Sequence, residues 1–91
     1  GSFFTYWELI DIAFGDYYNL GYDVAAVLEK NNDSYRVGIY QFIGFGFENM
    51  ETSEIYTNAK SIETVKEGSI DTLVLNFSGI KKNMQIQFIK Y

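Results

Sequence analysis

The 91-residue sequence contains no cysteine, no histidine and no proline. Without cysteine the chain has no disulfide framework, no thiol nucleophile and no cysteine-based zinc site. Without histidine it lacks the usual general base near neutral pH and the commonest metal ligand. Catalysis would have to rest on carboxylates, Lys, Tyr or Ser. The sequence therefore predicts a protein that is not an enzyme and uses no metal or cofactor.

Long apolar runs are also missing, because no segment approaches the ~20 residues of a membrane-spanning helix. The composition is nevertheless 47% hydrophobic and 19% aromatic, which predicts one folded domain over residues 1–91. We expect a soluble, cytoplasmic protein of a bacterium or of an infected host cell. Gly1 and Ser2 have the look of a tag remnant, which leaves secretion open.

Positive charge is scarce in the first part of the chain. Residues 1–54 hold nine acidic and two basic side chains, a net charge of −7, whereas residues 55–91 have a net charge of +2. Binding to nucleic acid needs clustered Lys and Arg and is therefore disfavoured. The acidic part fits a basic protein partner, although solubility alone also explains it.

An N-terminal helix is predicted from a start signal and from apolar spacing. Thr5 and Glu8 match a capping box, and Phe4 and Leu9 are placed for a hydrophobic staple. The apolar residues that follow helical spacing are Leu9, Ile10, Ala13, Phe14 and Tyr17. The helix ends either at Gly15 or at Asn19, and the longer version is preferred because Tyr17 extends the apolar stripe.

Residues 35–47 are the longest apolar stretch and predict the central strand of a sheet. Residues 22–30 predict a strand paired with it through a turn at residues 31–34. We expect a bend near Gly44 and Gly46. The second face of this stretch carries Gly38 and Gly44 beside Tyr40 and Phe42, and we expect it to be covered by the helix or, failing that, to bind a partner.

The remaining elements complete the predicted fold. Residues 48–68 are ambiguous, and a strand at 53–57 followed by a turn or short helix ending at Gly68 is preferred. Residues 70–77 and 84–91 predict a second hairpin with a basic loop at 78–83. The predicted fold class is thus α+β, with an N-terminal helix packed on an antiparallel sheet of four or five strands built from two hairpins.

No motif in the sequence carries recognisable chemistry. The glycines around Phe45 lack the further glycine and the helix of a phosphate loop. Glu8 and Asp11 are better explained as a solvated face than as an acid and base pair. The acidic residues Glu48, Glu51 and Glu54 lie close in sequence but lack the spacing of a calcium-binding loop.

The segment of residues 16–23 is the predicted partner-binding site. Its members are Asp16, Tyr17, Tyr18, Tyr22 and Asp23. Tyrosine is favoured at protein interfaces because it offers a large, stiff contact area with a polar end, and the flanking acids favour a basic partner. In the alternative interpretation, Tyr17 and Tyr22 cap the core and Tyr18 is incidental.

Three functions remain open at this point. The preferred one is a small acidic protein that inhibits or neutralises a larger protein, a character shared by phage anti-defence, anti-CRISPR and toxin-immunity proteins. The second is a structural or assembly module that forms a homodimer or joins a complex. The third is a small-ligand pocket between helix and sheet, lined by Trp7, Tyr40 and Phe42.

Overall fold

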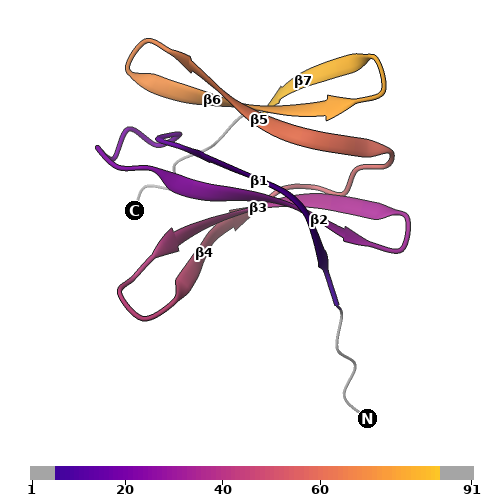
Figure 1. Cartoon of the computed structure of the whole chain (residues 1–91), viewed down its shortest axis with the longest axis horizontal. Helices are drawn as coiled ribbons and strands as arrows, with labels where there is room; N and C mark the ends of the chain where they lie inside the picture. Colours follow the sequence, from indigo (N-terminus) through magenta and orange to yellow (C-terminus); the bar gives the residue numbers. More distant parts are fainter. Residues whose placement is uncertain (1–5, 85–91) are drawn as a thin grey trace.

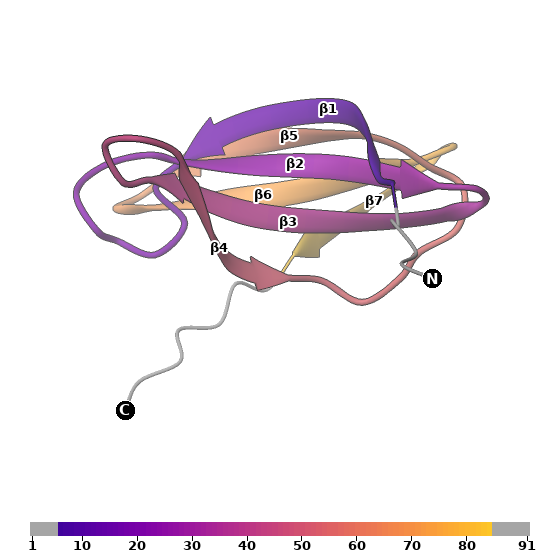
Figure 2. The ribbon, with the colours of Figure 1, turned by 90° about the horizontal axis from the view of Figure 1, so that it is seen from below.

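The structure is a computed structural model that describes residues 6–84, and this part of the chain forms seven strands in two antiparallel sheets (Figure 1). The bounds are β1 Glu8–Gly15, β2 Val24–Asn31, β3 Ser34–Phe42, β4 Phe47–Thr52, β5 Ala59–Glu67, β6 Ile70–Phe77 and β7 Ile80–Met84. One sheet has the strand order β1-β2-β3-β4 and the other β5-β6-β7. The two sheets lie in stacked layers (Figure 2).

The predicted N-terminal helix is wrong, and so is the α+β fold class, because residues 6–84 contain no helix. Strand β1 occupies its place. The apolar residues of this segment fit strand alternation as well as helical spacing, and β-branched Ile12 with aromatic Phe14 favours a strand. Pairing with β2 along the whole of β1 decides the outcome. Phe4 and Thr5, which carry the predicted staple and cap, lie outside the described residues.

The β2–β3 hairpin is confirmed, with Asn32 at φ 54° in its turn. The predicted central strand is only partly correct, because β3 ends at Phe42 and β4 begins at Phe47. The chain reverses between them at the predicted bend, where Gly44 has φ 97°. Glycine adopts such a left-handed backbone without steric cost.

The strand expected at residues 53–57 is wrong. This segment forms only one isolated bridge, between Tyr35 and Tyr56, and the following strand is β5. Strand β6 has the predicted bounds. The predicted loop at 78–83 is mostly strand, because β7 begins at Ile80 after a tight turn with Gly79 at φ 77°. Residues 85–91 of the predicted last strand lie outside the described residues.

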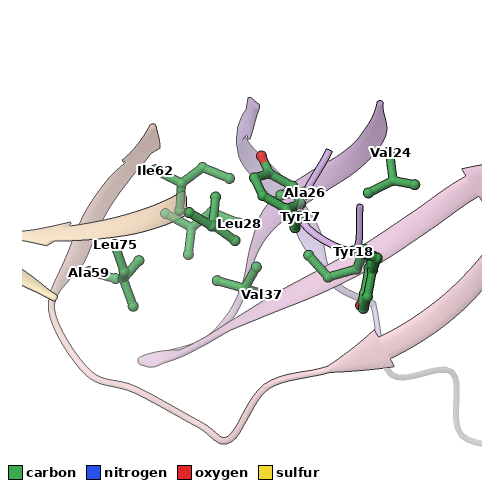
Figure 3. Close-up of a cluster of buried hydrophobic side chains, with 11 residues drawn as sticks. Tyr17, Tyr18, Val24, Ala26, Leu28, Val37, Ala59, Ile62 and Leu75 are labelled. Atoms are coloured by element: carbon green, nitrogen blue, oxygen red, sulfur yellow. The ribbon is translucent and has the colours of Figure 1, made fainter. Parts of the chain in front are cut away.

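The core lies between the inner faces of the two sheets (Figure 3). Leu28 and Ile39 from one sheet meet Leu73 and Leu75 from the other, and all four are almost completely buried. Burying such a side chain contributes about 1.5–3 kcal/mol. The described part of the chain has no helix that is long and apolar enough to cross a membrane.

Side chains join the two sheets where β1 lies beside β5. The Asp11 carboxylate accepts the Ile62 amide at 2.9 Å, and the Thr64 hydroxyl donates to the Phe14 carbonyl at 2.9 Å. These bonds satisfy backbone groups of two edge strands that would otherwise be free to pair with another chain. Asp11 is therefore a structural residue of this junction.

Candidate functional site

The outer face of the four-stranded sheet is apolar and has no second layer of described residues over it (Figure 2). Strand register places Ile12 beside Val27, and Phe14 beside Ala25, on the side opposite the core. Val27 and Ala25 are nevertheless buried. The apolar face, as we call it, consists of Ile12, Phe14, Ala25, Val27, Tyr40, Phe42 and Phe47.

Tyr40 covers the centre of the apolar face by lying over Gly38. A Cβ atom at Gly38 would stand 2.7 Å from the Tyr40 ring, so the close approach requires glycine. The Tyr40 hydroxyl donates to the Glu29 carboxylate at 3.0 Å. Burial raises the pKa of Tyr40, and the adjacent Glu29 raises it further.

A charged cluster borders the apolar face at the start of β3. Arg36 donates to Glu29 at 2.8 Å, and its guanidinium lies 3.9 Å from the centre of the Trp7 ring. Stacking on tryptophan and pairing with a carboxylate hold the arginine in one orientation. The predicted ligand pocket between helix and sheet cannot form as described, because Trp7, Tyr40 and Phe42 belong to one open face.

At its other end the apolar face continues into the β3–β4 hairpin. Phe42 and Phe47 are directly opposed across the two strands, and their rings meet edge to face with centroids 5.6 Å apart. Ile43 and Phe45 in the turn are also exposed. We call residues 42–47 the hairpin tip.

The outer face of the three-stranded sheet has a different character. It forms a shallow depression lined by Glu63, Val65, Glu67, Thr72, Val74, Lys81 and Asn83. Lys81 and Glu63 form an ion pair across it at 3.0 Å. This face therefore surrounds Val65 and Val74 with charged and polar side chains, as expected for the outer face of a two-layer fold.

The predicted site at residues 16–23 is split by the structure into a buried and an exposed part. The side chains of Tyr17 and Tyr18 are only 4% and 6% exposed and join the core, where they close one end of the space between the sheets (Figure 3). Tyr18 donates its hydroxyl to Glu51 on β4. Tyr17 bonds Thr64 on β5 at 2.7 Å, and it is the donor because the Thr64 proton goes to the Phe14 carbonyl.

Burial is the main reason that the pKa of both hydroxyls is raised, with Glu51 contributing at Tyr18. Asp16 organises the same loop, since its carboxylate accepts the amides of Leu20 and Gly21 at 2.7 and 2.9 Å. Its own amide donates to Asp71 at 2.8 Å. Asp16, Tyr17 and Tyr18 therefore hold the loop in place.

Tyr22 and Asp23 remain on the surface. The Tyr22 hydroxyl donates to Gln41 at 3.2 Å, and Gln41 donates to Glu48 at 2.7 Å. These bonds connect the loop to the base of the hairpin tip. The predicted interface at 16–23 thus stays a prediction for its exposed members, Tyr22 and Asp23, which lie next to the hairpin tip.

The sequence-based prediction did not place Ile12, Phe14 and Phe47 on an exposed face. The first two were assigned to a helix, and Phe47 to the end of a single central strand. The turn glycines Gly44 and Gly46 are the signal that could have divided that stretch into two strands with an exposed tip.

Within residues 6–84, no group of three or more acidic side chains is placed to hold a metal ion. Comparison with protein-family models, with curated proteins and with solved structures finds no match for this chain. The chemistry of its own surface is therefore the basis for any functional assignment.

Proposed function

We propose that this chain is a non-enzymatic binding protein that inhibits or neutralises a larger protein by docking its apolar face on a basic surface of that partner. The observation that carries the proposal is the apolar face itself. A sheet in a two-layer fold needs one apolar side for its core, and large uncovered apolar surfaces are typical of protein interaction sites.

Charge supports a basic partner. Residues 6–52, which include the four-stranded sheet, contain eight acidic and two basic side chains, and one of the two, Arg36, is paired with Glu29. Residues 53–84 contain four of each sign. An acidic surface around an apolar centre steers a basic partner toward it and repels a second acidic copy of the chain.

The test compares two double variants with similar exposure. Ile12→Thr with Phe14→Thr alters side chains that are 42% and 55% exposed on β1, whereas Ile70→Thr with Ile80→Thr alters side chains that are 46% and 64% exposed on the three-stranded sheet. Threonine suits strands, so both variants are expected to fold, which circular dichroism checks.

Immobilised wild type and both variants are used to capture proteins from a candidate host lysate, and affinity is then measured with the purified partner. We expect the β1 variant to bind at least about tenfold more weakly and the control to bind within about twofold of wild type. Inhibition of the partner's activity should fall in parallel. Equal loss in both variants would contradict the proposal.

The same samples test the homodimer alternative by light scattering. The proposal expects a monomer without its partner, because net negative charge opposes face-to-face pairing. A wild-type dimer that the β1 variant abolishes would assign the apolar face to a second copy of the chain instead.

A further inference from the structure

The hairpin tip is the most exposed apolar feature among the described residues. Phe45 is 92% exposed, Phe42 and Phe47 are each 65% exposed, and Ile43 is 42% exposed. Scattered apolar residues on a surface are ordinary, but four large ones within six consecutive positions form a patch. Figure 1 shows the β3–β4 hairpin projecting away from the three-stranded sheet.

The backbone of the hairpin tip is already fixed. The Ile43 amide donates to the Gly46 carbonyl at 2.9 Å, and Gly44 at φ 97° allows the reversal. The edge-to-face contact of Phe42 and Phe47 closes its base. A segment whose conformation is already fixed loses little conformational entropy on binding, and this favours a large contribution to binding affinity.

The surroundings of the hairpin tip are acidic. Residues 37–59 and residues 11–29 contain no Lys or Arg, and they carry Asp23, Glu48 and Glu51. Lys66, near the 16–23 loop, is paired with Asp71 at 2.8 Å. The apolar tip is thus flanked by carboxylates, and a complementary surface needs an apolar centre and cationic surroundings.

We propose that the hairpin tip is the anchor of the interface and enters an apolar pocket with a cationic rim on the protein partner. This inference rests on the proposed function, because the partner is the one that docks on the apolar face. Insertion into an anionic membrane is disfavoured by the flanking carboxylates, and pairing with a second copy by like charge.

The first test uses a synthetic amphipathic peptide of leucine and lysine, which presents an apolar stripe flanked by ammonium groups. A serine and lysine peptide of equal charge is the reference ligand. We expect wild type to bind the leucine peptide more tightly, as measured by fluorescence anisotropy. Equal binding of both peptides, or binding of neither, would overturn the inference.

The tip variant is Ile43→Ser with Phe45→Ser, and it leaves the Ile43 backbone bond available. Its control is Ile55→Ser, which changes a 54% exposed side chain in the 53–58 segment near the start of β3, at the opposite end of the strand. We expect the tip variant to bind the leucine peptide at least about tenfold more weakly and the control to bind like wild type.

The Ile12→Thr, Phe14→Thr variant separates this inference from the proposed function. Weakened binding of the peptide in that variant but not in the tip variant would overturn the inference and leave the proposed function standing. Weakened binding in neither variant would contradict both. Neutral phosphatidylcholine vesicles test a membrane anchor. If wild type binds them and the tip variant does not, the inference is overturned and the hairpin tip is a membrane anchor.

Discussion

The two outer faces of this protein differ although the two sheets have the same role in the core. Each sheet places leucine on its inner face, Leu28 in one and Leu75 in the other. On the outside, charged and polar side chains surround the valines of the three-stranded sheet, while the four-stranded sheet is mostly apolar apart from the Arg36–Glu29 pair. Folding requires only the inner faces. The second apolar side of the four-stranded sheet therefore calls for an explanation other than the core.

Two buried valines make the difference concrete. Val27 and Val74 each lie at the centre of an outer face, at 9% and 4% exposure. Val74 pairs in register with Glu63 and Asn83, and long polar side chains cover apolar surface while keeping their ends in water. Val27 lies between Ile12 and Gly38, so its neighbourhood is apolar or without a side chain.

The largest expected effect tests whether the inner faces are equivalent. Leu28→Ala and Leu75→Ala each remove a completely buried side chain from the shared core. We expect each to lower the free energy of unfolding by about 2–5 kcal/mol, as measured by urea denaturation. If either substitution lowers the free energy of unfolding by less than about 1 kcal/mol, its sheet does not depend on this core. The two outer faces could then not be compared as faces of sheets with the same structural role.

The next effect compares the ion pair on each outer face. In the Arg36–Glu29 pair the side chains are 29% and 13% exposed, against 68% and 43% in the Lys81–Glu63 pair. Glu29→Gln also weakens the bond from Tyr40, so we expect it to cost about 1–2 kcal/mol. Glu63→Gln should cost less than about 0.5 kcal/mol. If urea denaturation shows that the two variants lose the same free energy of unfolding, the Arg36–Glu29 pair is no better shielded from water than the Lys81–Glu63 pair.

Much of the sheet structure could be predicted from local signals. The alternation and turn residues around 31–34 gave the β2–β3 hairpin, and strand β6 was bounded by Gly68 and Gly79. The β1 segment could not be settled in this way, because its apolar residues suit both a helix and a strand. Pairing with β2, a contact between distant residues, overrides local preference there.

The candidate site was harder to predict, because the burial of a side chain depends on which part of the other sheet packs against it. The segment at 16–23 has several tyrosines, and the sequence alone does not tell which of them turn inward. Tyr17 and Tyr18 lie in the core, where their hydroxyls form hydrogen bonds with Thr64 and Glu51, residues far along the chain. The sequence predicted that the face with Gly38 and Tyr40 would bind a partner if no helix covered it. Residues 6–84 contain no helix, and binding of a partner at this face remains a prediction.

A smaller effect should appear in alkaline solution. The raised pKa of Tyr40 means that the folded state favours the neutral phenol, so its stabilising contribution is complete below the unfolded pKa of about 10 and is lost as the pH rises through the folded value. Tyr40→Phe removes this titration from the four-stranded sheet. We expect its free energy of unfolding to fall less steeply than that of wild type above about pH 10.

Two other tyrosines with a raised pKa, Tyr17 and Tyr18, are the control for that measurement. Tyr17 and Tyr18 also have a raised pKa and stay in the variant, so some alkaline destabilisation should persist. Identical pH profiles of wild type and Tyr40→Phe would show that the centre of the apolar face does not hold a neutral phenol. Urea denaturation at several pH values measures both.

The smallest effect on stability is expected where the four-stranded sheet is most apolar and most exposed. Phe45→Ser changes a side chain that is 92% exposed, so the free energy of unfolding should stay within about 0.5 kcal/mol of wild type. Ile80→Thr, which changes a 64% exposed side chain on the three-stranded sheet, should behave similarly. A loss above about 1 kcal/mol for Phe45→Ser in urea denaturation would mean that this phenylalanine packs within the fold. If the stability is unchanged, folding does not explain a phenylalanine at the hairpin tip. An exposed aromatic side chain adds a risk of aggregation unless a partner covers it, so binding is then the reason for this residue.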